Sequence, residues 1–319
     1  MDFYKYQHKR GGMAKFLVKG GAGFIGSNIV KELVEAGEQV RVIDNFSTGK
    51  RENLEPFLNQ IELIEGDIRS YHIVREAVDS VDYILHQAAL PSVPRSIKDP
   101  VTTTEVNVTG TLHVLEAARD AKVKRVVFAS SSSIYGDLDV LPKTEEMLPK
   151  PLSPYAVSKL AGEKYCQVFT KIYGLQTISL RYFNVFGPNQ DPNSQYSAVI
   201  PKFIKLMKAG EQPVIFGDGT QSRDFTYVAN VVKANLLACS DAAEEFSGEV
   251  FNIACGQRVT LNALVETINA SIDMQIEPKY SEPRPGDVMH SLANIGKARQ
   301  FLHYNPETKF EEGIKLLIA

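Results

Sequence analysis

The chain has 319 residues, of which 44% are hydrophobic and 23% charged, a balance typical of a globular, enzyme-sized protein of one or two packed units. Its formal net charge of −3 and its short apolar runs give no reason to expect nucleic acid or a membrane as a partner. Three cysteines, Cys166, Cys239 and Cys255, lack CxxC spacing and predict reduced thiols, which together with the lack of a signal sequence favours a cytoplasmic protein.

The first part of the chain alternates between two kinds of pattern. Residues 1–12 are polar and basic, and we expect them to form a disordered extension before Met13. From there to about Arg181, short β-branched runs alternate with stretches of helical periodicity. The predicted strands are 15–19, 39–44, 61–67, 81–87, 125–130 and 176–182, and the predicted helices between them include 27–37, 107–121 and 155–172. Residues 13–182 therefore predict an α/β fold, a doubly wound parallel sheet of the Rossmann type.

The pattern changes after residue 182, where loops rich in Gly, Pro and Asn dominate and strands are few and short. Helical periodicity continues at 198–210, 227–239 and 260–272. We predict that residues 183–319 form mainly a smaller C-terminal α/β lobe that binds the substrate, with some segments returning to the first domain. Such a lobe would cover the carboxyl ends of the strands, where open α/β sheets bind ligands.

A glycine-rich turn, "KGGAGFIGSN", joins the first predicted strand to the first predicted helix. Gly20, Gly23 and Gly26 permit a tight turn and the close approach of a pyrophosphate to the amino end of the helix. Asp44 ends the second strand, where a carboxylate accepts hydrogen bonds from an adenosine ribose and repels a 2′-phosphate. The pattern therefore predicts NAD as the cofactor.

Other residues near the strand ends complete this prediction. Lys50 and Arg51 follow Asp44 closely enough to leave NADP as an alternative. His86 is expected to be a buried structural residue, and no metal site is expected, because the six histidines form no HxxxH or HxxE pair. Further cofactor contacts are expected at the ends of the third and fourth strands, from Asp67, Ile68, Gln87, Ala88 and Ala89.

A reaction centre is predicted at the carboxyl edge of the sheet. Ser131 follows a central strand, while Tyr155 and Lys159 at i and i+4 share one helix face. A lysine ammonium beside the phenol, with a positive nicotinamide ring nearby, lowers a pKa that starts near ~10, so Tyr155 could act as a base near neutral pH. The alternative is that Tyr155 and Lys159 only belong to an amphipathic helix.

Together these motifs resemble a known family. The GxxGxxG loop, the acidic residue after the second strand, the serine four residues before Tyr135 and the YxxxK pair resemble the extended short-chain dehydrogenase/reductase family over nearly the whole chain from Met13. The segments "RYFNVFGP", "SRDF" and "RPGDV" resemble its NAD-dependent sugar-nucleotide epimerases, closest to the UDP-N-acetylglucosamine 4-epimerase and UDP-glucose 4-epimerase groups. The resemblance implies a homodimer paired through helices 107–121 and 155–172.

The resemblance also implies roles for individual residues. Ser131 would be the catalytic serine, Tyr155 the base, and Lys159 its activator and a ligand of the nicotinamide ribose. Implied additional cofactor contacts are Phe24, Ile25, Asn45, Phe46, Ser47, Thr48, Gly49, Asn107 and Phe183. Implied substrate contacts are Asn184, Arg223, Arg284 and Asp287 at the diphosphate, Ala198, Val199, Val214, Ile215 and Phe216 around the uracil, and Ser132, Ser133 and Ser291. Guanidinium groups suit phosphate oxygens, although the two arginines could also form surface ion pairs.

The implied reaction is epimerisation at C4 of a UDP-hexose through a transient 4-keto sugar. Related dehydratases and decarboxylases are expected to carry an acid after the catalytic hydroxyl residue, so Ser132 and Ser133 favour epimerisation over these alternatives. Ser291 aligns where a bulky residue restricts the pocket to plain hexoses, which favours UDP-GlcNAc/UDP-GalNAc, with UDP-Glc/UDP-Gal as the second pair. Alternatively, Ser291 caps a helix. A further alternative is an NAD-sensing module without chemistry.

Two residues depart from the family pattern. Lys19 stands where the family usually has Thr before the first glycine, and Thr104 stands where related sequences often have Asn. Lys19 places a long cation under a tight loop, so we expect a changed cofactor affinity unless its stem reaches solvent or a phosphate.

Overall fold

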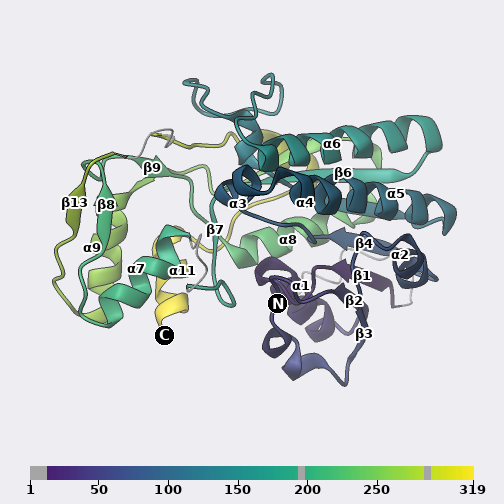
Figure 1. Ribbon diagram of the computed structural model, residues 1–319, viewed down its shortest axis with the longest axis horizontal. Coiled ribbons are helices and arrows are strands. Elements are labelled where there is room, and N and C mark those ends of the chain that lie inside the picture. Colours follow the sequence, from purple (N-terminus) through teal and green to yellow (C-terminus); the bar gives the residue numbers. More distant parts are fainter. Residues whose placement is uncertain (1–12, 193–197, 284–288) are drawn as a thin grey trace.

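The computed structural model describes residues 13–192, 198–283 and 289–319 (Figure 1). Three of the predictions above lie outside the described residues: the disordered extension 1–12, Arg284 and Asp287.

The described chain builds one large parallel sheet with the strand order β3-β2-β1-β4-β5-β6-β11. All neighbouring strands pair in parallel. Its strands are β1 Lys15–Lys19, β2 Gln39–Asp44, β3 Ile61–Glu65, β4 Tyr83–His86, β5 Arg125–Ser131, β6 Gln176–Tyr182 and β11 Val250–Ile253. The six predicted strands are confirmed, although the third and fourth are shorter than predicted. The seventh, β11, was not predicted as a strand and comes from the C-terminal half of the chain.

Helices cover both faces of this sheet, which confirms the doubly wound α/β prediction (Figure 1). On one face lie α1 Phe24–Glu35, α8 Val228–Ala238 and α10 Gly296–Leu302. On the other lie α2 Tyr71–Val78, α5 Gly110–Asp120 and α6 Pro154–Tyr173, with α3 Val93–Lys98 and α4 Pro100–Thr104 packed against α6. The order of the strands reverses between β1 and β4, and such a switch point is where open α/β sheets bind nucleotides.

Helix α6, which carries Tyr155 and Lys159, has well-defined ends. The Ser153 side chain accepts a hydrogen bond from the Ala156 amide at its start, and Gly174 ends it in the left-handed region at φ 71°. Its middle approaches the sheet closely, because a Cβ at position 162 would lie 2.3 Å from the Phe128 ring. The glycine there brings the α6 side chains within reach of strand β5.

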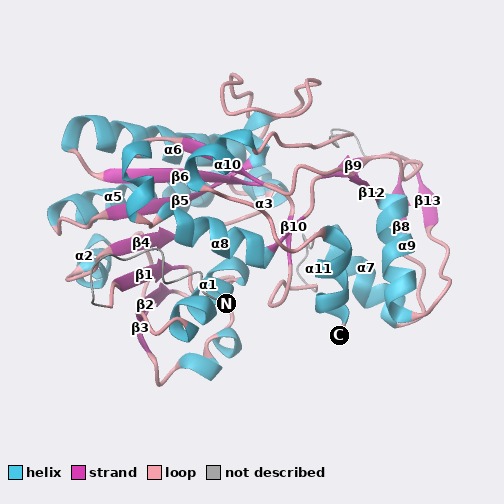
Figure 2. Cartoon of the chain, turned by 180° about the vertical axis from the view of Figure 1, so that it is seen from behind, coloured by secondary structure: helices cyan, strands magenta, loops and turns pink. Residues whose placement is uncertain are grey.

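The C-terminal half also forms a smaller lobe with its own core, seen beside the sheet in Figure 2. Strand β8 pairs in parallel with β13, and helices α7, α9 and α11 pack around the shared apolar cluster. The lobe elements are α7 Val199–Lys208, β8 Val214–Phe216, α9 Leu261–Ile272, β13 Lys279–Ser281 and α11 Phe310–Ile318. Two further two-stranded sheets are formed by β7 Val185–Phe186 with β10 Thr226–Tyr227, and by β9 Ser222–Arg223 with β12 Val259–Thr260.

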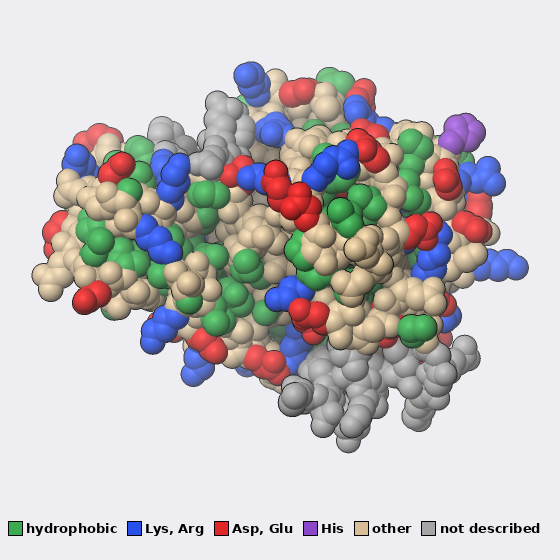
Figure 3. Space-filling model, turned by 90° about the horizontal axis from the view of Figure 1, so that it is seen from below, with side chains coloured by type: hydrophobic (Ala, Val, Ile, Leu, Met, Phe, Trp, Pro, Cys, Tyr) green, Lys and Arg blue, Asp and Glu red, His purple; other side chains and the backbone are tan. Residues whose placement is uncertain are grey.

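Two further features are the distribution of charged side chains on the surface and the lengths of the helices. On the face seen in Figure 3, acidic and basic side chains are interspersed rather than gathered by sign. Within residues 13–192, 198–283 and 289–319, no helix is both long and apolar enough to cross a bilayer.

Candidate functional site

The glycine-rich turn after β1 lies against the end of β4. Gly20 adopts φ 76°, and a Cβ there would lie 2.7 Å from the Ala88 amide nitrogen. A Cβ at Gly26 would lie 2.0 Å from the carbonyl oxygen of Gly20, so α1 starts directly on the turn. Both positions therefore require glycine. The turn and the amino end of α1 form a cradle suited to the diphosphate of a dinucleotide.

Asp44 lies at the end of β2, beside this turn. Its Oδ2 accepts a hydrogen bond from the Ala22 amide at 2.9 Å, and its Oδ1 accepts one from the Phe46 amide at 2.8 Å. Burial raises the pKa of the carboxyl group, while these amide bonds oppose the rise. The carboxylate keeps further lone pairs, which suits it to accept hydrogen bonds from a ribose.

Lys50 and Arg51, the two basic residues that left NADP as an alternative cofactor, both form contacts within the protein. Lys50 pairs with Asp191 at 3.6 Å, and the Arg51 guanidinium lies 4.0 Å above the centre of the Phe46 ring while also pairing with Glu65. These contacts hold both cations beside the loop of residues 45–49, which lies at the edge of the predicted cofactor site.

Several predicted cofactor residues are buried in the protein. Asn107 is 2% exposed, and its side chain bonds the backbone of Leu90 and the hydroxyl of Ser158. Phe183 is fully buried in the core, and its contact with the cofactor stays a prediction. Ile68 is 5% exposed and packs in the core under the other face. A large apolar ring next to a strand end is drawn into the core because burial stabilises it.

Two of the residues singled out from the sequence, His86 and Gln87, lie at the end of β4. Gln87 directly follows the strand, and its amide donates to Tyr182 at 3.2 Å and to Asn235 at 2.9 Å. His86 is 1% exposed, and its Nε2 lies 3.0 Å from the Thr111 hydroxyl, so its assignment as a buried structural residue is confirmed. In the described part of the chain, no cluster of His, Cys, Asp and Glu is arranged to hold a metal ion.

The predicted reaction centre is assembled at the carboxyl end of β5. The Ser131 hydroxyl lies within hydrogen-bonding reach of the Tyr155 phenol. Lys159 is 4% exposed, its ammonium donates to the carbonyl of Ala129 at 2.8 Å, and its Nζ lies 5.9 Å from the centre of the Tyr155 ring. The three side chains therefore meet where β5 faces the start of α6.

The side chains of this centre do not by themselves favour an ionised phenol. Burial raises the pKa of the Tyr155 phenol, and the hydrogen bond from Ser131 only partly opposes that rise. Burial also lowers the pKa of Lys159 to about 8, so this lysine alone does not produce a phenolate. A cationic ligand beside the phenol is needed to lower its pKa.

Lys19 lies under the glycine-rich turn and points away from solvent. It is 0% exposed, and its Nζ has no hydrogen-bond partner among the described residues. Burial lowers its pKa to about 7. The alternative in which its stem reaches solvent is therefore excluded, and the neutral amine is favoured above neutral pH. The changed cofactor affinity stays a prediction.

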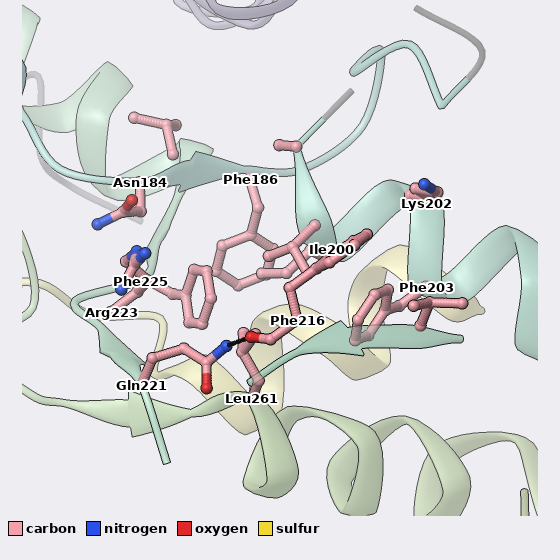
Figure 4. A pocket seen from close by; sticks show the side chains of 14 residues that line it. Asn184, Phe186, Ile200, Lys202, Phe203, Phe216, Gln221, Arg223, Phe225 and Leu261 are labelled. Atoms are coloured by element: carbon pink, nitrogen blue, oxygen red, sulfur yellow. Dashed lines mark hydrogen bonds between the residues drawn. The ribbon is translucent and has the colours of Figure 1, made fainter. Parts of the chain in front are cut away.

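A pocket of about 320 Å³ opens in the smaller lobe, and it contains most of the predicted nucleotide residues (Figure 4). Figure 4 shows Asn184 and Arg223 at one end, Lys202 and Phe203 at the other, and aromatic rings between them. The predicted residues that line it are Asn184, Ala198, Val199, Val214, Phe216 and Arg223. An apolar pocket with a guanidinium and an amide at one end suits a nucleoside whose phosphates lie at that end.

Two of the predicted substrate residues, Ile215 and Ser291, are not among the residues that line this pocket. Ile215 is 0% exposed and belongs to the core of the lobe, because alternate residues of β8 point to opposite faces. Ser291 caps no helix, since α10 begins at Gly296 and Ile295 stands at its cap position. Instead, the Ser291 amide donates to the carbonyl of Ser222, which precedes Arg223.

Several residues of the pocket could not be identified from the sequence. The pocket is also lined by Val185, Phe186, Ile200, Lys202, Phe203, Gln221, Phe225 and Leu261. Most of these are apolar side chains at helical or strand spacing, which predicts core packing equally well. Gln221 is the informative one, since its Nε2 donates to the Phe216 carbonyl at 2.6 Å and so fixes the strand that borders the pocket.

Comparisons with known proteins agree with this geometry. Residues 16–254 match the model of the NAD dependent epimerase/dehydratase family. The chain is similar to a UDP-N-acetylglucosamine 4-epimerase from Methanobrevibacter ruminantium M1, solved in complex with UDP-N-acetylmuramic acid, with 42% identity and a TM-score of 0.91 over 96% of this chain and 97% of that one.

Two further relatives have similar coverage. A UDP-glucose 4-epimerase from Thermotoga maritima, solved with UDP-glucose, is 38% identical with a TM-score of 0.89, over 95% of this chain and 97% of that one. A UDP-glucose 4-epimerase from Mycolicibacterium smegmatis is 36% identical over 93% of this chain and 95% of that one.

Proposed function

This chain belongs to the NAD-dependent epimerase/dehydratase family, and on that premise we propose that it is a UDP-sugar 4-epimerase acting on UDP-GlcNAc and UDP-GalNAc. The observation that carries the proposal is the meeting of Ser131, Tyr155 and Lys159 at the edge of the sheet, with Ser132 and Ser133 following where an acid would support dehydration. UDP-Glc and UDP-Gal are the second candidate pair.

The cofactor of the family is NAD, and this chain offers residues that fit it. The turn through Gly20, Gly23 and Gly26 would hold the diphosphate, Asp44 the adenosine ribose, and Lys159 the nicotinamide ribose. Bound NAD would supply reversible hydride transfer at C4 of the sugar, the chemistry that inversion at that carbon requires. Tyr155, whose pKa is raised by burial, would have its phenolate stabilised by the positive charge of such a cofactor held beside it.

The side chains of this chain then handle the proton and the position of the sugar. Tyr155, as its phenolate, takes the proton of the 4-hydroxyl and returns it after the sugar turns, while Ser131 bonds the same oxygen. Asn184 and Arg223 at the end of the pocket hold the diphosphate still, so that the ketone can present either face. Arg284 and Asp287 are proposed to assist there.

The choice of sugar is proposed from Ser291. Its backbone is tied to Ser222 at 3.0 Å, so its small side chain has a fixed place beside the segment that carries Arg223. A small residue leaves room for a 2-acetamido group, and pocket size of this kind is worth about 10- to 200-fold in selectivity.

A homodimer is proposed from the outer face of α6. Val157, Val168 and Ile172 are 52%, 44% and 66% exposed and lie on one side of that helix. Ile97 and Val101, on the neighbouring α3 and α4, are 64% and 66% exposed. A second copy covering this face would remove apolar surface from water. The cytoplasmic location expected from the sequence stays a prediction.

The test is a product assay on the purified protein with both sugar pairs. We expect interconversion of UDP-GlcNAc and UDP-GalNAc, and at least about a thousandfold lower kcat in Tyr155→Phe, since a positioned base contributes on that order. Tyr165→Phe on the same helix is the control and should retain activity.

Other products would point to the alternatives. A dehydrated or decarboxylated nucleotide sugar would identify those related enzymes, and bound NAD without any turnover would favour an NAD-sensing module. An unchanged rate in Tyr155→Phe would contradict the proposed mechanism.

A further inference from the structure

A buried polar network lies behind the reaction centre and has no part in the proposed chemistry. Glu163 follows Lys159 by about one turn of α6 and is 1% exposed. Its Oε1 accepts hydrogen bonds from the Ser130 hydroxyl and from Arg181 Nε, the latter at 2.9 Å, and its Oε2 accepts one from Arg181 Nη2 at 2.9 Å. Since Ser130 precedes Ser131, this ion pair holds the end of β5 against α6.

The network continues from the guanidinium in one direction. Arg181 Nη1 donates to the Tyr135 hydroxyl at 2.8 Å, and that hydroxyl donates to Asn252 Oδ1 at 2.7 Å. Asn252 Nδ2 then donates to the carbonyls of Lys143 at 3.0 Å and Asn294 at 3.2 Å. Because an arginine can only donate, the tyrosine proton must point to Asn252, which fixes the orientation of that amide. The chain of bonds therefore has a single arrangement.

The network ends on the segment 289–294, which carries Ser291. On one side of this segment, the Lys143 amide donates to the carbonyl of Leu292 at 2.7 Å. On the other side, the Ser291 amide donates to the carbonyl of Ser222 at 3.0 Å. Ser291 therefore lies between the network behind the reaction centre and the strand that leads to the phosphate-binding end of the pocket.

A buried ion pair is a costly way to stabilise a protein, because two charges lose their water. Apolar residues of similar volume often stabilise a fold as well or better. Arg181 is 4% exposed, and Tyr135 and Asn252 are 1% and 0% exposed. All of these polar groups have therefore lost most of their contact with water. What a fully bonded network provides, and apolar packing does not, is a fixed relative position of the elements that it joins.

We propose that Glu163, Arg181 and Tyr135 are positioning residues that hold the segment 289–294 in place relative to Ser131 and Tyr155, and thereby set the preference between 2-acetamido and plain hexoses. The part of this inference that concerns sugar preference rests on the proposed function. The part that concerns the placement of segment 289–294 can be measured without enzyme turnover.

The experiment uses Tyr135→Phe and Arg181→Lys in the full chain. Tyr135→Phe keeps the ring and removes the bond to Asn252, and Arg181→Lys removes the paired geometry toward Glu163. We expect peptides that cover 289–294 to exchange amide hydrogens at least about tenfold faster in both variants. We also expect the ratio of kcat/KM for UDP-GlcNAc to that for UDP-Glc to fall by about tenfold, with bound NAD unchanged.

Arg125→Lys is the matched control. Arg125 is 3% exposed at the start of β5, where it bonds Gln176 and the carbonyls of Ala238 and Ser240, at the opposite end of the same pair of strands. This control should lower the melting temperature without changing exchange in 289–294 or the sugar ratio.

Two outcomes would overturn the proposal: exchange in 289–294 that rises no more than in Arg125→Lys, or a sugar ratio equal to that of the unaltered enzyme. If the unaltered protein epimerises neither sugar, the proposed function and the assignment of preference both fail. The exchange data still decide whether the network places the segment.

Discussion

At the scale of single residues, Lys19 is the clearest departure from what the sequence suggests. The sequence left open that the stem of this lysine reaches solvent, yet the side chain is enclosed beside His86, its register partner on β4. The pKa of His86 is lowered well below its usual value by burial and by the charges of Lys19 and Lys159. A charged Lys19 therefore has an unfavourable environment, and its titration should appear in the stability of the protein.

We predict that Lys19→Met stabilises the protein most near pH 6 to 7. The pKa of Lys19 is lowered from 10.5 to about 7 in the folded protein. Between those values the unfolded chain holds a proton that the folded protein lacks, so stability rises with pH by up to ~1.4 kcal/mol per unit in the unaltered protein. Below pH 7 both states are protonated and the full cost of burial remains.

Urea unfolding at pH 6.5, 8 and 9.5 checks this prediction. The advantage of Lys19→Met should shrink as pH rises, whereas Lys31→Met, at an exposed position of α1, should show no such trend. An advantage that is the same at all three pH values would mean that Lys19 is not buried as an amine.

At the scale of elements, the π-helix Glu105–Thr109 shows how one irregularity places a side chain. It lies between α4 and α5 and contains Asn107, whose amide reaches Leu90 and Ser158 at once. The π-helix has an extra residue in its turn, which changes the helix face on which the Asn107 side chain lies. In a regular α-helix this side-chain amide would point in another direction. The prediction of one regular helix over 107–121 missed this feature.

Helix α6 depends on its close approach to β5, and we predict that Gly162→Val disrupts the reaction centre. The new side chain would meet the Phe128 ring, since even a Cβ lies 2.3 Å from it. Moving α6 outward would break the bond from Lys159 to the Ala129 carbonyl and cost about 1–3 kcal/mol. The free energy of unfolding, measured from unfolding curves, and kcat should both decrease.

Lys164→Val is the control for Gly162→Val, since position 164 is exposed on the same helix. It introduces the same side chain without a clash and should change stability by less than about 0.5 kcal/mol. Equal losses in the two variants would show that contact with β5 does not explain the effect.

At the scale of the whole molecule, the proposed dimer interface lies mainly on the outer face of α6. We predict that Ile172→Glu, which places a charge at a 66% exposed apolar position, converts the dimer into monomers. Sedimentation velocity across a range of concentrations measures the change. Leu316→Glu is the control, because Leu316 is 55% exposed on α11 in the other lobe. A monomer in the unaltered protein would contradict the proposal.

The sequence alone determined the features that depend on neighbouring residues. Strands β1, β2 and β6 were predicted with their observed bounds, because short apolar and β-branched runs indicate a strand from neighbouring residues alone. In β1 and β2 a following Gly20 or a final Asp44 also marks the end. The glycine turn and the Tyr155 and Lys159 pair were identified for the same reason, since their spacing along one turn and one helix is read within a few residues.

Only the tertiary structure decided the features that depend on distant residues. Strand β11 joins the sheet beside β6, the pocket is lined by apolar side chains that read as core, and Glu163 and Asn252 meet through Arg181 and Tyr135. Burial and bonding of such groups depend on which surfaces exclude water together. That outcome is fixed by packing across the whole chain rather than by local periodicity.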